Sequence, residues 1–517
     1  LLHTSVDTWT LTLRSLCTGQ SVVGRRRLFQ LVMLMASSLA TSSRRFLVGV
    51  CSIPLFRRNV HVTTPCCYYV EGSHEPFAPI PDRFPRWATS GEDAFSHLKD
   101  GAKVFVHGGA ATPSLLVKEL HQYVMSRGIK DVQLFHIHTE GPFPFNDPEC
   151  AGHFRTNSLF TGSNCRQAIN EGRADFTPIF LSEIPLLFRR KHVELDLAIV
   201  SITPPDRHGF CSLGPSVDVT RSAIQNAKFI VGQVNPHMPL TRGDASIHVS
   251  NIGVLMHGPQ PLHETKARKI TEVEQRIGKY IAEELVPDGA TMQMGIGSIP
   301  DAVLSQLTNH QHLGVHTEMF SDRLVDLVKL GVITNSMKKM RPGKIVTSFV
   351  IGTKKCFDFL DNNPFVDMCD IAWVNSPVII AQNPRPMAIN SCIEVDLTGQ
   401  VVSDSIGSRI YSGVGGQVDF IRGAAISTDG EGKPIIALPS VTSKGESKIV
   451  PFLKEGGGIV TTRAHVHYIV TEFGIAYLFG RNLRQRAYAL INIAHPDHRE
   501  ALEKAAFERL KVMPSPD

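Results

Sequence analysis

The stretch "AKVFVHGGAATPSLLVKELHQYVMSRGIKDVQLFHIH", residues 102–138, sets the pattern that the rest of the chain repeats. Its first part, "AKVFVHG", is a short apolar run of the kind that forms a buried strand. Its middle part, "SLLVKELHQYVMSRG", has apolar residues at helical spacing and ends in Gly128, a common helix stop. Its last part, "KDVQLFHIH", predicts a second strand. A strand, a helix and a strand in this order indicate parallel strands covered by helices.

The same alternation continues along the chain. The runs "LDLAIVSIT" and "AKFIVGQVN" predict two more strands, and a second block begins after "HETKARK". There, Thr271 followed three residues later by Glu274 forms the pattern of a capping box at a helix start. The apolar face predicted for this helix, which Pro287 closes, consists of Val273, Ile277, Tyr280, Ile281 and Leu285.

The second block predicts further strands at "ATMQMG", "IAWVN", "PIIALP" and "GGIVTT", with a helix from Pro300. We therefore predict an α/β protein with two α/β domains, residues 75–262 and 263–517. The default place for a site in such a protein is the cleft between the domains.

Composition and charge limit the classes of protein to which this chain could belong. The 517 residues are 42% hydrophobic and 20% charged, which suits two globular domains. The net charge of +5 comes from residues 8–70, which contain eight arginines and no Asp or Glu, so it gives no reason to expect nucleic acid. The ten cysteines, including the adjacent Cys66 and Cys67, form no CxxC pair, which favours a reducing compartment.

The same segment predicts a location. An Arg-rich, Ser-rich and acid-free stretch is typical of a mitochondrial transit peptide, so we expect residues 1–70 to be a disordered leader. Met33 or Met35 would make a natural start. A basic tail without a targeting role is the alternative. No apolar run is long enough to span a bilayer, so we expect a mature protein without a membrane partner.

Three glycine-containing turns could carry chemistry. In "MQMGIGSIPDAV", Gly295 and Gly297 lie between a strand and a helix, where free N–H groups can bind phosphates, although a plain tight turn is the better explanation of an isolated GxG. In "YSGVGGQVDFIRGA", Gly415 and Gly416 could present N–H groups to an oxyanion or form a flexible loop. The loop "HGGAATP" could present N–H groups to a carboxylate substrate or simply turn the chain.

Other patterns argue against common enzyme classes. His136 with His138, and His465 with His467, are two-apart pairs that could bind metal, but neither shows a third ligand, so packed or hydrogen-bonded histidines are the better interpretation. The chain contains no GxSxG, P-loop or HExxH motif. Glu318, in "LGVHTEMFSD", is a lone carboxylate in a strand-like run, either a solvated edge or a nucleophile delivered to a crevice.

Taken in order, the motifs resemble the acetyl-CoA hydrolase/transferase family, which includes 4-hydroxybutyrate CoA-transferase and acetate:succinate CoA-transferases. The resemblance runs from about residue 78 to residue 510 and is carried by "PPDRHGFCSLGPSVD", "GQVNPHMP", "MGIGSIPDAV", "LGVHTEMFSD", "AINSCIEVDLTGQV", "SGVGGQVDFIRGA", "ALPSVTSKGESKIVP" and "VTEFGIAYLFGRNLRQRA". It implies two similar open α/β domains of the CoA-transferase type, often paired as homodimers.

The resemblance also implies residue roles. Glu318 stands where the family has its catalytic glutamate, and Gly416 and Asn375 stand where it has oxyanion donors. The residues implied to lie against CoA are Gly295, Gly297, Ile299, Pro300, Asn390 and Gly415. The residues implied to line the substrate are Gly108, Gly109 and Gln293. CoA thioesters would be substrates, and no metal, nucleotide or other cofactor is expected.

One departure bears on the acceptor. Many members read Pro-Arg-Thr where this chain has Pro239-Leu240-Thr241-Arg242. Leu240 therefore stands at the usual arginine position, and if an arginine of this loop recognises succinate, it would have to be Arg242.

These observations together predict a mitochondrial CoA-transferase that moves CoA from acetyl-CoA to a carboxylate, most simply succinate, through a glutamyl-CoA thioester on Glu318. Acetyl-CoA hydrolysis, or transfer to another acid such as 4-hydroxybutyrate, stays open as an alternative. A non-catalytic acyl-CoA sensor would be expected to lack Glu318. A nicotinamide dehydrogenase fits less well, because no acidic ribose ligand follows the Gly295 turn.

Overall fold

The computed structural model describes residues 77–265 and 269–517, and all of them belong to one compact unit. The predicted leader, residues 1–70, and the Cys66–Cys67 pair lie outside the described residues. The six cysteines that are described are all free and buried. Within the described ranges, no helix has the length and apolar character needed to cross a membrane.

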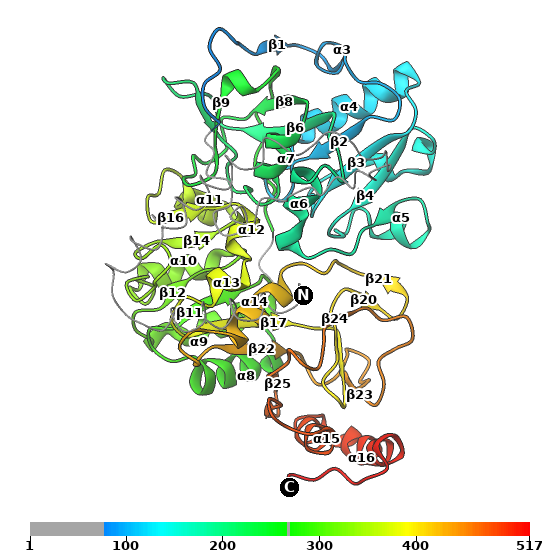
Figure 1. Ribbon diagram of the computed structural model, residues 1–517, viewed down its shortest axis with the longest axis vertical. Helices are drawn as coiled ribbons and strands as arrows, with labels where there is room; N and C mark the ends of the chain where they lie inside the picture. The colour runs from blue at the N-terminus through cyan, green and yellow to red at the C-terminus, as the bar shows by residue number, and fades with distance from the viewer. Residues whose placement is uncertain (1–76, 266–268) are drawn as a thin grey trace, which may run out of the picture. The chain divides into compact units, whose positions relative to one another are not determined.

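The N-terminal half forms one eight-stranded sheet, drawn in blue to green in Figure 1. Every neighbouring pair in it is parallel, as the strand-helix-strand pattern predicts. In spatial order the strands are β1 Arg86–Ala88, β10 Val254–His257, β8 Phe229–Val234, β6 Leu197–Ile202, β2 Lys103–Val106, β3 Val132–His136, β4 Phe154–Ser158 and β5 Asp175–Phe176.

The C-terminal half is built on a second, six-stranded sheet (Figure 1). Its pairs are parallel except the last, which is antiparallel. In spatial order the strands are β12 Gly314–Val315, β11 Thr291–Met294, β17 Pro386–Ser391, β22 Lys433–Ala437, β25 Tyr468–Thr471 and β26 Gly474–Tyr477.

Short strands form five smaller sheets. They are β7 Phe210–Ser212 with β9 Ser246–His248, β13 Met319–Phe320 with β15 Phe349–Val350, β14 Ile345–Thr347 with β16 Val366–Met368, β20 Ser405–Ile406 with β21 Arg409–Ile410, and the group β23 Ile449–Val450, β18 Glu394–Asp396, β19 Val401–Val402 and β24 Ile459–Thr461.

Helices connect the strands of both sheets. In the N-terminal half they are α3 Gly91–Ala94, α4 Ser114–Arg127, α5 Arg166–Asn170, α6 Ile184–Arg189 and α7 Thr220–Asn226. In the C-terminal half they are α8 Glu272–Tyr280, α9 Ser298–Gln306, α10 Asp322–Lys329, α11 Lys354–Leu360, α12 Ile371–Val374, α13 Pro377–Ile380, α14 Gln417–Ala425, α15 Leu483–Asn492 and α16 Pro496–Leu510.

Local signals in the sequence explain several of these bounds. Helix α4 ends at Gly128, whose φ of 65° is the left-handed conformation that glycine adopts without strain. Thr271 and Glu274 form the predicted capping box at the start of α8. Beyond Tyr280 the chain makes one π-helical turn, Ile281–Leu285. Tyr280 is 37% exposed, so its predicted place on the apolar face is wrong; the buried Ile277 and Ile281, four positions apart, define that face.

Two other predictions need correction. The apolar run "IAWVN" predicts a strand, but it forms helix α12, since the Asp370 side chain accepts a hydrogen bond from Ala372 N and caps it. Helix α9 begins at Ser298, before Pro300. The strand-like run around Glu318 is divided into β12 and β13, which pair with different strands.

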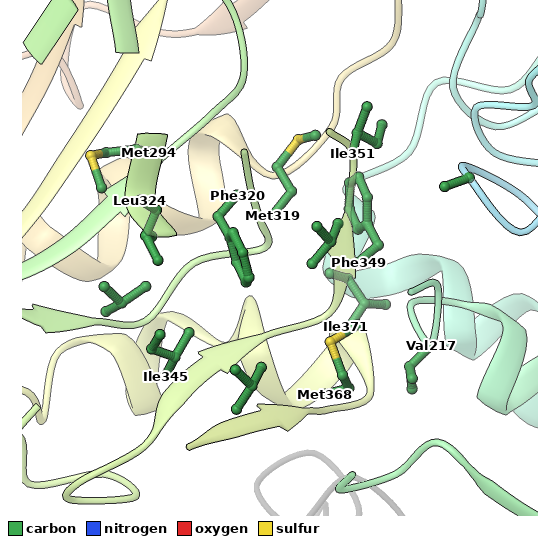
Figure 2. Packing of buried hydrophobic residues seen from close by; sticks show 14 of the residues in the cluster. Val217, Met294, Met319, Phe320, Leu324, Ile345, Phe349, Ile351, Met368 and Ile371 are labelled. Carbon is green, nitrogen blue, oxygen red and sulfur yellow. The ribbon is translucent and has the colours of Figure 1, made fainter. Parts of the chain in front are cut away.

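Strand β13 is anchored in an apolar core that both halves share. Figure 2 shows Met319 and Phe320 close to Leu324, Phe349 and Ile371. Val217, from the N-terminal half, belongs to the same cluster, and its N–H donates to Ser348 O at 3.0 Å. This core holds the backbone next to Glu318 rigidly against both halves of the protein.

Candidate active site

The backbone at Glu318 is fixed on both sides. Thr317 Oγ1 donates to Met294 O at 2.9 Å, which ties this segment to the end of β11. Glu318 O accepts hydrogen bonds from Ser348 N and Phe349 N, both at 3.0 Å. Glu318 therefore follows the carboxyl end of the parallel strand β12, and the predicted helix start comes next, with Ser321 as the N-cap of α10. Ligands bind beyond such strand ends in open α/β sheets.

The Glu318 side chain contacts the two groups predicted as oxyanion donors. Asn375 Nδ2 donates to Glu318 Oε2 at 3.1 Å, from the residue that ends α12. Gly416 is the N-cap of α14, and a Cβ at this position would stand 2.0 Å from Glu318 Oε2 and 2.2 Å from Asn375 Nδ2. Only glycine fits at that spacing. The N-terminus of α14, the positive end of its dipole, thus lies beside the Glu318 carboxylate.

Burial sets the electrostatics of this carboxylate. The loss of solvent raises the pKa of Glu318 to about 6, against a smaller lowering by the Asn375 hydrogen bond. Glu318 is therefore ionised at neutral pH but is held by a single side-chain donor. A carboxylate that is ionised and only lightly hydrogen-bonded is suited to nucleophilic attack.

The N-terminal half holds the glycine loop in place. Leu181 N donates to Gly415 O at 3.0 Å. Gly415 has a φ of 62°, so its left-handed backbone favours glycine. The Phe160 ring lies over Gly413 and Gly415, with carbon atoms 2.8 Å and 3.2 Å from where their Cβ atoms would stand. The loop that presents Gly416 is therefore packed between the two halves.

The turn predicted to contact CoA follows β11 directly. Gly297 has a φ of 121°, and a Cβ at Gly295 or Gly297 would meet no atom within 4 Å, so this turn borders open space. Ile296 is exposed, whereas Ile299 and Pro300 are buried. A cavity of about 440 Å³ lies beside the turn. Its lining includes Ile296, Gly297, Ser321, Arg323 and Lys355.

The other predicted residues fall in two groups. Gln293 and Asn390 are on the neighbouring strands β11 and β17, and Asn390 Nδ2 donates to Gln293 Oε1 at 2.9 Å. Gly108 and Gly109 follow β2, and Gly109 N donates to His138 O at 2.7 Å. The structure thus brings Glu318, Asn375 and Gly416 into contact, while the roles of all these residues stay predictions.

The histidine pairs and Arg242 make local contacts. His138 Nε2 lies 2.5 Å from Glu140 Oε1, and His136 is buried in the core, where burial lowers its pKa to about 4. His467 packs against Phe479. Among the described residues, no group of three His, Cys, Asp or Glu is arranged to hold a metal ion. Arg242 is exposed and hydrogen-bonds to Asn362.

The structure adds residues that the sequence did not single out. Asp419, in the first turn of α14, accepts from Asn375 Nδ2 at 3.3 Å. His316 lies 2.8 Å, through Nε2, from Val374 O, next to Asn375. Asp419 lies three residues after Gly416 in the quoted glycine motif, and this spacing on one helix face was the only signal that could have found it.

Comparisons with known proteins identify the family of this chain. The model of the acetyl-CoA hydrolase/transferase N-terminal domain matches residues 81–277, and that of the C-terminal domain matches residues 352–506. A succinyl-CoA:acetate/propanoyl-CoA:succinate CoA transferase of Fasciola hepatica is 73% identical over 460 residues, which cover 89% of this chain and 96% of the relative. A 4-hydroxybutyrate coenzyme A transferase of Clostridium kluyveri is 46% identical, covering 80% of this chain and 95% of that protein.

Solved structures are similar as well. RipA from Yersinia pestis matches with a TM-score of 0.78 at 32% identity, covering 83% of this chain and 98% of RipA. The 4-hydroxybutyrate CoA-transferase from Porphyromonas gingivalis matches with a TM-score of 0.70 at 37% identity, covering 82% and 98%. The fold and the site define an α/β CoA-transferase. The chain belongs to the acetyl-CoA hydrolase/transferase family.

Proposed function

We propose that this protein transfers CoA from acetyl-CoA to succinate, giving acetate and succinyl-CoA, by a ping-pong mechanism with Glu318 as the nucleophile. The observation that carries the proposal is the contact of Glu318 Oε2 with both Asn375 Nδ2 and the position of Gly416. The 73% identical relative, named for succinate and acetate, supports the choice of substrates.

The proposed first half-reaction releases acetate. The Glu318 carboxylate attacks the thioester carbonyl of acetyl-CoA, and the C–S bond breaks to give a mixed acetyl-glutamyl anhydride and CoA thiolate. The thiolate then attacks the Glu318 carbonyl, so the anhydride C–O bond breaks, acetate leaves and a glutamyl-CoA thioester remains. Succinate reverses these steps and leaves as succinyl-CoA. Each step exchanges one acyl bond for another, and the protons balance without an external base.

Each residue has a proposed part in these steps. The Asn375 amide and the Gly416 N–H would donate to the oxyanions of the tetrahedral intermediates, where one such donor is typically worth about 2.7–4 kcal/mol. We place CoA along the Gly295–Gly297 turn and its 440 Å³ cavity. There Arg323 would attract its phosphates, whereas Lys355 is ion-paired with Asp326, and Asp301 and Asp322 also line the cavity.

Trapping tests the covalent step. Incubation with acetyl-CoA should add the mass of CoA to Glu318, and borohydride should then reduce the thioester at this residue. Addition of succinate should remove the adduct and yield succinyl-CoA. A Glu318→Ala variant that forms the same adduct would refute the mechanism. CoA release without an acceptor would favour the hydrolase alternative, and turnover with 4-hydroxybutyrate alone would favour the other transferase.

Location and assembly form further parts of the proposal. We propose that residues 1–70 direct the protein to the mitochondrial matrix, because they combine arginines with an absence of acidic residues after Asp7. A reporter fused to these residues should enter mitochondria, and a fusion with its eight arginines changed to Gln should not. We also propose a homodimer, which sedimentation analysis would detect as twice the chain mass of 56.9 kDa, less any cleaved leader.

A further inference from the structure

The Asn375 amide lies between two carboxylates. Its Nδ2 donates to Glu318 Oε2 at 3.1 Å and to Asp419 Oδ2 at 3.3 Å. Its Oδ1 is buried and has no hydrogen-bond partner in the part of the chain that the structure describes. The two N–H bonds of one amide therefore account for all of the polar contacts seen for this side chain.

This arrangement fixes which way the amide faces. An amide nitrogen has two hydrogens, and here each has its own acceptor. If the amide turned over, Oδ1 would face Glu318 Oε2 and Asp419 Oδ2, and three acceptor oxygens would repel one another. With only Glu318 as an acceptor, the N–H that now reaches Asp419 would be buried and unpaired, which is unfavourable. Asp419 removes this cost and selects the orientation that serves Glu318.

Asp419 is itself clamped by the other half of the protein. Ser182 Oγ donates to Asp419 Oδ1 at 2.8 Å, and Ser182 N donates to Asp419 Oδ2 at 3.2 Å. The Asp419 side chain is buried, and it lies in the first turn of α14, where the helix dipole favours a carboxylate. These two hydrogen bonds hold the Asp419 carboxylate with Oδ2 in place to accept from Asn375 Nδ2.

We propose that Asp419 is a positioning residue, which orients the Asn375 amide toward Glu318 and is held in place across the two halves by Ser182. Asp419 acts through Asn375 and does not touch the substrate. The inference rests on the proposed CoA transfer, because its effect is on the group that would donate to the oxyanion. It also means that the catalytic orientation within the C-terminal half depends on a residue of the N-terminal half.

A double-mutant cycle on the full chain tests the proposal. The variants are Asp419→Ala, Asn375→Ala and the double variant, assayed for transfer from acetyl-CoA to succinate. Asp419→Ala removes the acceptor of Asn375 Nδ2, whereas Asn could keep every contact by accepting at Oδ1 and donating from Nδ2 to Ser182 Oγ. We expect the kcat of Asp419→Ala to fall about 10- to 100-fold, with the KM for acetyl-CoA unchanged within about twofold.

The decisive result is whether the loss of kcat caused by the Asp419 substitution depends on the presence of the Asn375 amide. In the Asn375→Ala background, Asp419→Ala should change kcat less than about twofold, because there is no amide left to orient. An equal loss in both backgrounds would overturn the proposal. Ser182→Ala should shift kcat in the same direction, by a smaller factor, because Ser182 N still donates to Asp419.

Two control variants distinguish a positioning role of Asp419 from a general loss of stability and from a failure of the proposed chemistry. Asp396→Ala removes a buried carboxylate that accepts from Thr398 and Arg509, and we expect it to lower thermal stability without changing kcat. If Asp396→Ala lowers kcat as much as Asp419→Ala, the effect is structural and the proposal fails. Glu318→Ala reports on the proposed function alone. Full activity in Glu318→Ala would refute the proposed chemistry. If Glu318→Ala is inactive but the effects of the Asp419 and Asn375 substitutions simply add, only the role of Asp419 is refuted.

Discussion

The charge on Glu318 should make the native protein less stable, so we predict that Glu318→Gln stabilises it while abolishing transfer. Burial raises the pKa of Glu318 from 4.5 to about 6. The native state therefore holds an ionised carboxylate less favourably than the unfolded chain does. Gln has nearly the same shape as Glu and carries no charge, and its Oε1 can still accept from Asn375 Nδ2.

The size of the effect follows from that pKa. Each pKa unit corresponds to about 1.4 kcal/mol, so the rise from 4.5 to about 6 means that the ionised Glu318 lowers the free energy of unfolding by about 2 kcal/mol when the side chain has no solvent contact. Because the side chain keeps some solvent contact, we expect Glu318→Gln to raise the free energy of unfolding by about 1–2 kcal/mol at about pH 8. With about 2.1 cal/mol/K of unfolding entropy per residue, this is about 1–2 °C in Tm.

The dependence on pH gives the sharper check. The native pKa is raised, so the wild-type protein gains stability as pH falls from about 6 toward 4.5, where native Glu318 takes up a proton first. The difference between Glu318→Gln and the parent should therefore shrink by more than half at about pH 5. Paired thermal scans at both pH values measure it, with the exposed Glu455→Gln as a control that should show no difference. A variant no more stable than the parent at about pH 8, or a difference independent of pH, would refute the reasoning.

Three other predictions concern activity. The kcat/KM for acetyl-CoA should fall as the pH is lowered, because only the ionised carboxylate of Glu318 attacks. It should reach half its maximum near the Glu318 pKa of about 6. A pH–rate profile that is flat through this range would contradict the prediction. Gly416→Ala should lower kcat by at least about 100-fold, since its Cβ would force Glu318 and Asn375 apart, and near-normal kcat in a folded variant would show that the reaction does not need this close packing. Gly295→Ala should raise the KM for acetyl-CoA without lowering Tm, because the added Cβ meets no protein atom within 4 Å, and an unchanged KM would move CoA away from this turn.

Local sequence signals predicted much of the fold. Strands β2, β3, β6 and β8 and helix α4 lie within the stretches predicted for them, because short apolar runs and a helical period are set by neighbouring residues. The errors arose where neighbouring residues are compatible with more than one structure. The apolar run of α12 has the composition of a strand although Asp370 caps it as a helix, and the helical period alone did not separate the exposed Tyr280 from the buried Ile277 and Ile281.

The site was predictable only in part. The family resemblance pointed to Glu318, Asn375 and Gly416, which the structure brings into contact. Ser182 could not be found, because its contact with Asp419 joins residues 237 positions apart and depends on how the two halves pack. Nothing in the sequence around Ser182 indicates that its side chain would donate a hydrogen bond to Asp419.

The burial of Glu318 underlies both its proposed reactivity and its predicted cost to stability. Two or three strong donors to Glu318 would hold its pKa well below the usual range and would stabilise the charge that has to attack. The structure instead gives Oε2 one side-chain donor and directs the second N–H of that donor to Asp419. Burial also raises the pKa of Asp419 to about 7, with a contribution from the nearby Glu318 charge. Two close carboxylates are thus kept in a site that disfavours both charges, and the packing of the two halves has to supply the free energy that holds them there.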